Sequence, residues 1–367
     1  MTDCNNAVRN AETLRNIVKD LVPLDGVSYA FAYGSGVFKQ LGQTLAQSKA
    51  NMIDFAFVVR DPVSWHRMNL AKNNKHYSLP GRIVGARAVS HFQTSYNAYC
   101  YCNTLLRLPA PLAPARFKYS VISENQLISD LLDWETLYIS GRLHKPVLEI
   151  VPPEIETGKN AHLTSSTSSH SNPARLMSDQ MSLKDAIDRN LKSAVHATCL
   201  LLPEHFSKET FYVKLAGLSY NGDFRNFVGE DKNKVSNIVK ASLDQMDDIY
   251  LPILTKLPLS VTTTSDKIEH DLSPTAIHHH LVMLPTQVQW KLHDAWSYKQ
   301  KRNYDLEEVL FALSRQRNYS AFVDWSLRSI VFESSVKQTL KNVISAGVTK
   351  SVTYGGTKIM KMIRSFR

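Results

Sequence analysis

The chain has 367 residues, of which 43% are hydrophobic and 21% charged, a composition typical of a soluble globular protein with room for two domains. No apolar run approaches the ~18 residues that a membrane-spanning helix needs, so any membrane contact is expected to be peripheral. The excess of 43 Lys and Arg over 33 Asp and Glu gives a formal net charge of +10, which favours a polyanionic partner, either nucleic acid or anionic lipid.

The first part of the chain predicts a small α/β domain in which strands and helices alternate irregularly. Apolar residues at helical spacing predict a helix over residues 10–22, which Pro23 ends. Strands are predicted over 27–33, 52–59, 83–89, 96–108 and 147–151, and further helices over 64–76 and 124–140. The segment 52–59 is nearly all apolar, so we expect it at the centre of the sheet.

After this domain the pattern becomes mainly helical. Helices are predicted over 182–202, 206–219, 232–250, 276–282 and 306–313. The polar, Ser-rich stretch before them has too little apolar area to order itself and is interpreted as a loop or linker. The predicted divisions are residues 1–155, a linker over 156–177, a helical domain over 178–329 and a tail over 330–367.

The predicted tail is basic and amphipathic. It contains seven Lys and Arg but one acid, Glu333. Apolar residues recur at helical spacing, and Gly347, Gly355 and Gly356 interrupt them, which predicts two short helices. Such segments lie in the plane of an anionic membrane surface. The alternative is a last helix that packs on the core.

Cysteines and histidines give weaker signals. Cys100 and Cys102 lack a second pair at zinc-site spacing and are interpreted as core side chains of one strand. His278, His279 and His280 are adjacent, so on a helix they point in three directions and cannot chelate one ion. They are interpreted as a surface cluster.

The pattern most indicative of chemistry is Gly34-Ser35-Gly36 after a predicted strand, followed by Asp54 within an apolar strand. Glycines allow the backbone to approach phosphate oxygens, and N–H groups and the Ser35 hydroxyl can donate to them. A strand carboxylate beside such a turn can hold Mg²⁺. Although Gly-Ser-Gly alone more often marks a simple turn, a buried carboxylate needs a partner, and a metal ion is one.

This arrangement resembles the polymerase-β-like nucleotidyltransferase superfamily, whose mark is a Gly-Ser turn followed by an acid-x-acid pair. The sequence departs from that pattern in two ways. The spacing from Ser35 to Asp54 is longer than usual, and Ala56 stands in place of the second acid. Asp61 and Glu149 are the candidates for a second metal ligand, although Asp61 would face away from Asp54 in a regular strand.

A second resemblance covers nearly the whole chain. It rests on six segments that occur in order, YGSGVFKQ, NMIDFAFVV, WHRMNLAKNNKHYS, KYSVIS, LYISGRLHKPV and LSYNGDFR. These are similar to mitochondrial phosphatidate cytidylyltransferases, with Ser120 where glycine is expected. The resemblance implies an α+β chain with a nucleotidyltransferase domain and then a winged-helix-like domain. It also implies CTP and phosphatidic acid as substrates, Mg²⁺ as cofactor, and a peripheral location on the matrix side of the mitochondrial inner membrane, where the product CDP-diacylglycerol feeds cardiolipin synthesis.

Further candidate residues lie in these segments. His66, Asn69, Asn73 and His76 fall within roughly 80° on a helix, a neutral stripe interpreted as the lining of a substrate pocket rather than a solvated face. A single Lys such as Lys118 is usually solvated, but a cation offsets charge at a triphosphate site, and the resemblance favours contact of Lys118 with phosphate.

The turn 220–225 carries the other candidates. Tyr220, Asp223 and Arg225, with Lys234 at the next helix, could be turn and capping residues. The resemblance favours contact with nucleotide or phosphatidic acid instead.

The expected reaction is in-line attack by a phosphate oxygen of phosphatidic acid on the α-phosphorus of CTP. That oxygen is already ionised, so no general base is needed, and catalysis would rest on Asp54 with Mg²⁺, the Ser35 turn and Lys118. One alternative is a nucleotidyltransferase that acts on RNA, but no module of stacking aromatics beside a basic groove is evident, so no nucleic-acid partner is expected. The other is a non-catalytic membrane scaffold, for which Ala56 is the evidence.

Overall fold

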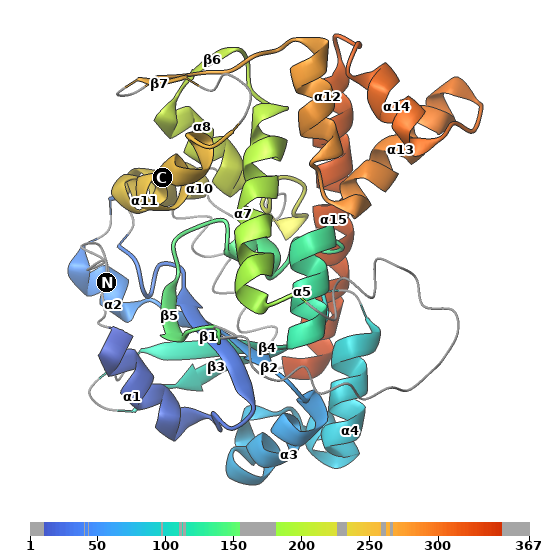
Figure 1. Cartoon of the computed structure of the whole chain (residues 1–367). Coiled ribbons are helices and arrows are strands. Elements are labelled where there is room, and N and C mark those ends of the chain that lie inside the picture. Colours follow the sequence, from blue (N-terminus) through green and yellow to red (C-terminus); the bar gives the residue numbers. More distant parts are fainter. Residues whose placement is uncertain are drawn as a thin grey trace.

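The computed structural model describes residues 11–346 except positions 40, 43, 97, 110–111, 113–114, 155–180, 226–232, 258–261 and 265–266. The protein is α+β, with a five-stranded sheet and a mainly helical part that stands on one face of it (Figure 1). None of the helices described is both long and apolar enough to cross a membrane.

The five-stranded sheet has the order β3-β4-β2-β1-β5. Its strands are β1 (Val27–Tyr33), β2 (Ile53–Val59), β3 (Cys100–Arg107), β4 (Arg116–Ser123) and β5 (Leu148–Val151). β2 and β4 are parallel, and the other neighbours are antiparallel. As its apolar sequence predicts, β2 is central, and Asp54 is its one residue that is not fully buried.

Helices cover both faces of this sheet. α1 (Ala11–Leu21) and α3 (Pro62–Lys72) pack on the face formed by Phe55, Phe57 and Tyr119. α5 (Glu124–Asp133) and the start of α7 (Leu183–Cys199) pack on the face that contains Phe31 and Ala56. Because alternate residues of a strand face opposite sides, Asp54 shares the face of Ala56.

Two local predictions differ from the structure. The segment 83–89 is not a strand but lies in α4 (Leu79–Ser95), which bends at Gly85 where φ is +77°. A short apolar run fits a buried helix as well as a strand, which explains the error. The helix predicted to reach residue 140 ends at Asp133, because Trp134 adopts a left-handed conformation and stops it. The short helix η2 (Ser140–Arg142) follows.

The helical part has its own large core around α7. It contains α8 (Lys208–Gly217), α10 (Lys234–Lys240), α11 (Leu243–Leu254), α12 (Pro274–Val282), α13 (Thr286–Gln300), α14 (Leu306–Leu313) and α15 (Tyr319–Ala346). A small antiparallel sheet, β6 (His205–Ser207), β8 (Lys267–Glu269) and β7 (Thr262–Thr264), lies at its edge.

The single helix predicted over 232–250 is two helices, and α13 was not predicted. Two further short helices, α2 (Leu45–Ala50) and η1 (Asn74–His76), belong to the sheet part.

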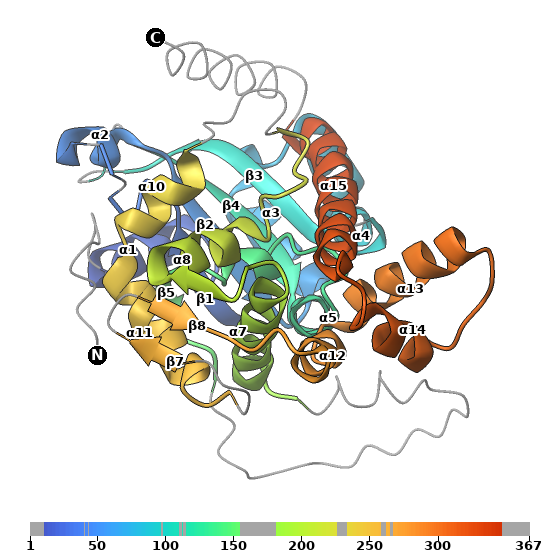
Figure 2. The same ribbon diagram turned by 90° about the horizontal axis from the view of Figure 1, so that it is seen from above.

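α15 connects the two parts, and it runs through residue 330, where the tail was predicted to begin. Its second half lies along the edge strand β3 (Figure 2). Lys341 Nζ donates to the Gln93 carbonyl at 3.1 Å, and Ser345 Oγ donates to the Cys102 carbonyl at 3.3 Å. Residues 330–346 therefore pack on the sheet rather than forming a separate short helix. The second helix predicted for the tail lies outside the described residues.

The stripe predicted to line a pocket is instead part of a buried hydrogen-bond network between α3 and the sheet. Asn69 Nδ2 donates to the hydroxyls of Tyr77 at 2.9 Å and Tyr119 at 2.8 Å. Further contacts join His66 Nδ1 to the Tyr77 hydroxyl, His66 Nε2 to Gln93 Oε1, His76 Nδ1 to the Tyr119 hydroxyl, and Asn73 Nδ2 to the Leu21 carbonyl and to Asn69 Oδ1. Tyr119 faces the side of the sheet opposite to Asp54. The structure thus does not bring the stripe to the predicted site.

This network predicts a stability effect for Asn69→Ala. The substitution removes the donor to two buried hydroxyls and leaves a small cavity, so the free energy of unfolding should fall by about 1–3 kcal/mol. Arg67 is an exposed residue of the same helix and provides the control. Arg67→Ala should change the free energy of unfolding by less than about 0.5 kcal/mol. Urea unfolding of both variants measures the difference. Equal urea midpoints for the two variants would show that the hydrogen bonds of Asn69 contribute nothing to stability.

Candidate active site

The turn Gly34-Ser35-Gly36 follows β1 and is held against the start of β2. Gly34 has φ of +84°, and its carbonyl accepts from the N–H groups of Val37 and Phe38, both at 3.0 Å. A Cβ on Gly36 would lie 2.5 Å from the Met52 carbonyl oxygen. Only glycine allows this approach, so the close packing of the turn on β2 explains the second glycine.

Asp54 lies directly under this turn. A Cβ on Gly34 would be 3.3 Å from Asp54 Oδ2. On the neighbouring parallel strand Lys118 is in register with Asp54, and its Nζ lies 3.3 Å from Asp54 Oδ1. The predicted residues Gly34, Asp54 and Lys118 are therefore brought together.

The Asp54 carboxylate fits a magnesium ligand. Its side chain is 21% exposed, and Oδ1 itself is buried without an aligned hydrogen bond from any described residue. The contact with Lys118 Nζ is thus an ion pair rather than a hydrogen bond. A carboxylate oxygen that lacks a hydrogen-bond donor and lies below a glycine turn is suited to a hard cation such as Mg²⁺.

The two candidates for a second metal ligand are engaged elsewhere. Asp61 is exposed and caps α3, where its carboxylate accepts from the N–H groups of Val63 at 2.9 Å and Ser64 at 3.3 Å. It lies beyond the far end of β2, and seven residues of strand correspond to about 20 Å. Glu149 accepts a hydrogen bond from the Tyr29 hydroxyl at 3.3 Å. The structure therefore does not support Asp61 as a metal ligand.

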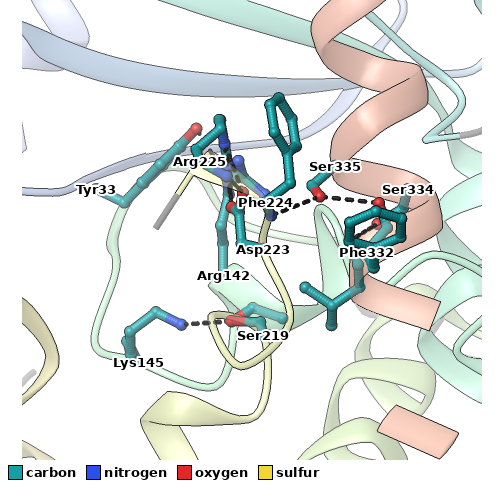
Figure 3. Close-up of polar contacts among 12 residues, drawn as sticks. Tyr33, Arg142, Lys145, Ser219, Asp223, Phe224, Arg225, Phe332, Ser334 and Ser335 are labelled. Carbon is teal, nitrogen blue, oxygen red and sulfur yellow. Dashed lines mark hydrogen bonds and ion pairs between the residues drawn. The ribbon is translucent and has the colours of Figure 1, made fainter. Parts of the chain in front are cut away.

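Beside Asp54, basic residues at and after η2 extend the site. Arg142 Nε donates to the hydroxyl of Tyr33, the strand partner of Asp54, at 3.0 Å. The Arg142 guanidinium also lies 4.0 Å from the centre of the Tyr138 ring, a cation–π contact. Lys145 Nζ donates to the Ser219 hydroxyl at 3.2 Å, which joins this segment to the helical part (Figure 3).

The helical part contributes the turn 220–225. Arg225 Nε donates to both carboxylate oxygens of Asp223, at 2.9 and 3.0 Å. The turn is fixed to α15, because the Phe224 N–H donates to Ser335 Oγ at 3.3 Å and a Cβ on Gly222 would lie 2.5 Å from the Arg328 carbonyl oxygen. Arg225 lies close enough to Arg142 and Tyr138 of the sheet part to interact electrostatically with both (Figure 3). Asp223 therefore holds Arg225 near the sheet part.

These groups lie close enough together to shift one another's pKa values. Burial raises the pKa of Tyr138 to about 12, while Arg142 and Arg225 oppose that rise. Burial, followed by Arg142 and Lys234, lowers the pKa of Lys145 to about 7.

The site carries more positive than negative charge. Lys145 and Lys234 both lie over the Tyr220 ring, with their Nζ atoms 5.1 and 5.2 Å from its centre. The cations are Lys118, Arg142, Lys145, Arg225 and Lys234, and the carboxylates are Asp54 and Asp223. Such a cluster suits a ligand with several phosphate groups.

Sequence reasoning missed Tyr33, Arg142 and Lys145 as site residues. The available signal was the segment LYISGRLHKPV, which contains Arg142 and Lys145 and belongs to the resemblance noted above. Neither cation stands out locally, because a single Lys or Arg is usually a solvated surface residue. The packing of η2 against Ser219 places Arg142 and Lys145 in the site. This packing is close, since a Cβ on Gly141 of η2 would lie 2.3 Å from Ser219 Cβ.

Comparison with known proteins identifies close relatives. Residues 14–169 and 169–361 match the family described as "Phosphatidate cytidylyltransferase, mitochondrial". The protein of that name from Xenopus laevis is 40% identical over 342 residues, which cover 93% of this chain and 92% of that protein. Its counterpart from Danio rerio is 39% identical over 362 residues, 98% of both chains. The Caenorhabditis elegans protein is 36% identical over 345 residues, 94% of this chain and 97% of that one.

The lowered pKa of Lys145 predicts that phosphate binding depends on pH. Above pH 7 the amine loses its proton, so the site loses one positive charge. A bound triphosphate raises the pKa of Lys145. Between the pKa of Lys145 in the free protein and its pKa in the complex, the affinity for triphosphate should therefore fall by up to about tenfold per pH unit. Calorimetric titration with inorganic tripolyphosphate from about pH 6 to about pH 9 measures this for wild type and Lys145→Gln. The ratio of wild-type affinity to Lys145→Gln affinity should shrink as pH rises. A constant ratio would contradict the claim that the protonated Lys145 binds phosphate.

Proposed function

The chain belongs to the family of mitochondrial phosphatidate cytidylyltransferases, and we propose that the site around Asp54 is where it carries out the reaction of that family. The chain is an enzyme that makes CDP-diacylglycerol, and its substrates are CTP and phosphatidic acid. The observation that carries the location is the Asp54 carboxylate, which lies below a phosphate-binding type of turn and beside Lys118. Its strand partner Tyr33 is contacted by Arg142, which acts electrostatically on Arg225 of the helical part.

In the proposed reaction a phosphate oxygen of phosphatidic acid attacks the α-phosphorus of CTP, and pyrophosphate leaves. The attacking oxygen is ionised at neutral pH, so the site needs no general base. The turn at Ser35 and the cation of Lys118 hold the nucleotide phosphates for in-line attack. Arg142, Lys145 and Lys234 offset the charge that develops on the leaving pyrophosphate. Mg²⁺ held by Asp54 would neutralise phosphate charge at the same centre.

The residues of the helical part fit substrate contact. Arg225 is oriented by a buried carboxylate, since Asp223 is 3% exposed. Tyr220 offers an aromatic face between two lysines. We propose that Tyr220, Arg225 and Lys234 contact nucleotide or the phosphate of phosphatidic acid, and that Asp223 is a positioning residue.

The fold supports a two-domain proposal. The order strand, Gly-Ser turn and strand with Asp54 is that of a polymerase-β-like nucleotidyltransferase domain, here over residues 1–155. The hairpin β7–β8 beside β6 and a bundle of helices favours a winged-helix-like second domain. Since α15 is continuous to Ala346, we propose that this domain extends through α15 rather than ending at residue 329.

The relatives are named as mitochondrial proteins, and we propose a peripheral location on the matrix side of the inner membrane, in a step that feeds cardiolipin synthesis. At the start of α4 three apolar side chains are exposed, Leu79 by 68%, Ile83 by 75% and Val84 by 56%. The exposed Arg82 and Arg87 lie on the same helix, and this combination favours contact with an anionic lipid surface. Residues 347–367, with their basic composition, would add to that attraction.

Asp54→Ala tests the site. Purified protein with CTP, Mg²⁺ and phosphatidic acid liposomes should form CDP-diacylglycerol, and Asp54→Ala should lower kcat by at least about 100-fold, because a metal ligand is lost. Its circular dichroism should match that of wild type and its melting temperature should change little, because Asp54 and Lys118 are both partly exposed and water can solvate Lys118 when its partner is removed.

Asp61→Ala is the matched control. It removes the cap of α3, so it should cost about 1 kcal/mol of stability but leave turnover near the wild-type value. Near-normal turnover by Asp54→Ala would overturn the assignment of the site. If wild type extends an RNA primer with CTP but ignores phosphatidic acid, the RNA-directed alternative holds. If it uses neither substrate, the scaffold alternative holds.

A further inference from the structure

A second cluster of ligand-type side chains is buried in the helical part. Cys199 ends α7, His270 follows β8 and His280 lies in α12, and one ligand atom of each lies within 4.8 Å of the others. Their exposed fractions are 1%, 2% and 3%. The interpretation of His278–His280 as a surface cluster is therefore wrong for His280. Adjacent histidines do point in different directions, but the partners of His280 come from other elements.

His270 has a ring nitrogen with an unused lone pair. Its Nε2 lies 2.8 Å from the Pro203 carbonyl oxygen, and because a carbonyl can only accept, Nε2 must carry the hydrogen. Nδ1 is then an acceptor, and it is buried without a donor among the described residues. Histidines that bind metal ions commonly hold their other ring nitrogen by a hydrogen bond of this kind.

His196 lies next to the cluster. Its Nδ1 is 2.8 Å from His280 Nδ1, so one of the two nitrogens must carry a hydrogen when no cation is present. Burial lowers the pKa of His196 to about 4 and that of His280 to about 3, which keeps both rings neutral at physiological pH. A neutral imidazole is the form that binds metal ions. The three candidate ligands thus come from three segments of the chain, and His196 contacts one of them.

We propose that Cys199, His270 and His280 bind a Zn²⁺ ion, and that His196 holds the His280 ring by the hydrogen bond between them. A set of one sulfur and two nitrogen atoms suits Zn²⁺ and disfavours Mg²⁺, which prefers oxygen ligands. Burial raises the pKa of Cys199 to about 12, so without a cation the thiol keeps its proton at neutral pH. Because a metal ion binds the thiolate, the thiol releases this proton when the cation binds. Asp271, which acts electrostatically on His280, offsets part of the added charge.

The three ligands are only 1–3% exposed, so a substrate cannot reach the ion and its role is structural. It ties the end of α7 to α12 and to the segment before α12. This site is separate from Asp54 and from the magnesium proposed there, and its presence does not depend on the proposed mechanism.

The metal content of the full-length protein tests this proposal. Protein purified without chelator and dialysed against micromolar Zn²⁺ should contain about one zinc ion per chain by plasma mass spectrometry. Cys199→Ser and His270→Gln should each lower that content at least tenfold. The controls are Cys100→Ser, another buried cysteine, and His278→Ala, which lies beside the cluster in sequence; both should retain the zinc. Wild type without zinc, or Cys199→Ser with as much as wild type, would overturn the proposal.

A measurement on wild type covers the case in which the variants fail to fold. When Co²⁺ replaces Zn²⁺, a tetrahedral site with a thiolate ligand gives a sulfur-to-metal charge-transfer band in the near ultraviolet and visible bands of tetrahedral Co²⁺. Both should appear and saturate at about one ion per chain. Their absence at saturating Co²⁺ would refute a Cys199-containing site. Mg²⁺ should not displace the Co²⁺, and displacement would likewise contradict this ligand set.

Discussion

The carboxylate of Asp54 lies on the central strand of the sheet, where each of its six neighbours in β2 is buried, so its charge must be compensated within the protein. The parallel pairing of β2 with β4 brings Lys118 into register with it. The turn at Gly34 closes over it, and Arg142 reaches the strand partner Tyr33. The cation, the turn and the strand partner around Asp54 are thus all placed by the strand on which this one charge lies.

The site also depends on contact between the two parts of the molecule. α15 packs on the edge strand β3 through Lys341 and Ser345 and holds the turn 220–225 through Ser335. The turn that contains Arg225 is therefore positioned by a helix that is itself fixed to the sheet. A fragment that ended at residue 329 would lose both contacts, so in the proposed site the helical part contributes directly to substrate contact.

The sequence predicted which residues lie together at the centre of the proposed site but not their surroundings. The turn at Ser35 and Asp54 could be predicted from the apolar strands beside them, and Lys118 from the resemblance. Arg142 could not, because its position depends on packing between residues far apart in the chain. A neutral stripe such as that of Asn69 has the same sequence pattern whether it faces a pocket or buried tyrosines. His280 likewise looked exposed, because its partners lie in α7 and after β8.

If one nucleotide bridges the two parts, a crystal structure with CTP and Mg²⁺ will show it. The expected result places the triphosphate within hydrogen-bond distance of Lys118 from the sheet part and of Arg225 or Lys234 from the helical part, with the cation on Asp54. A nucleotide bound by residues of one part alone, or a cation that does not touch Asp54, would contradict a shared site at this junction.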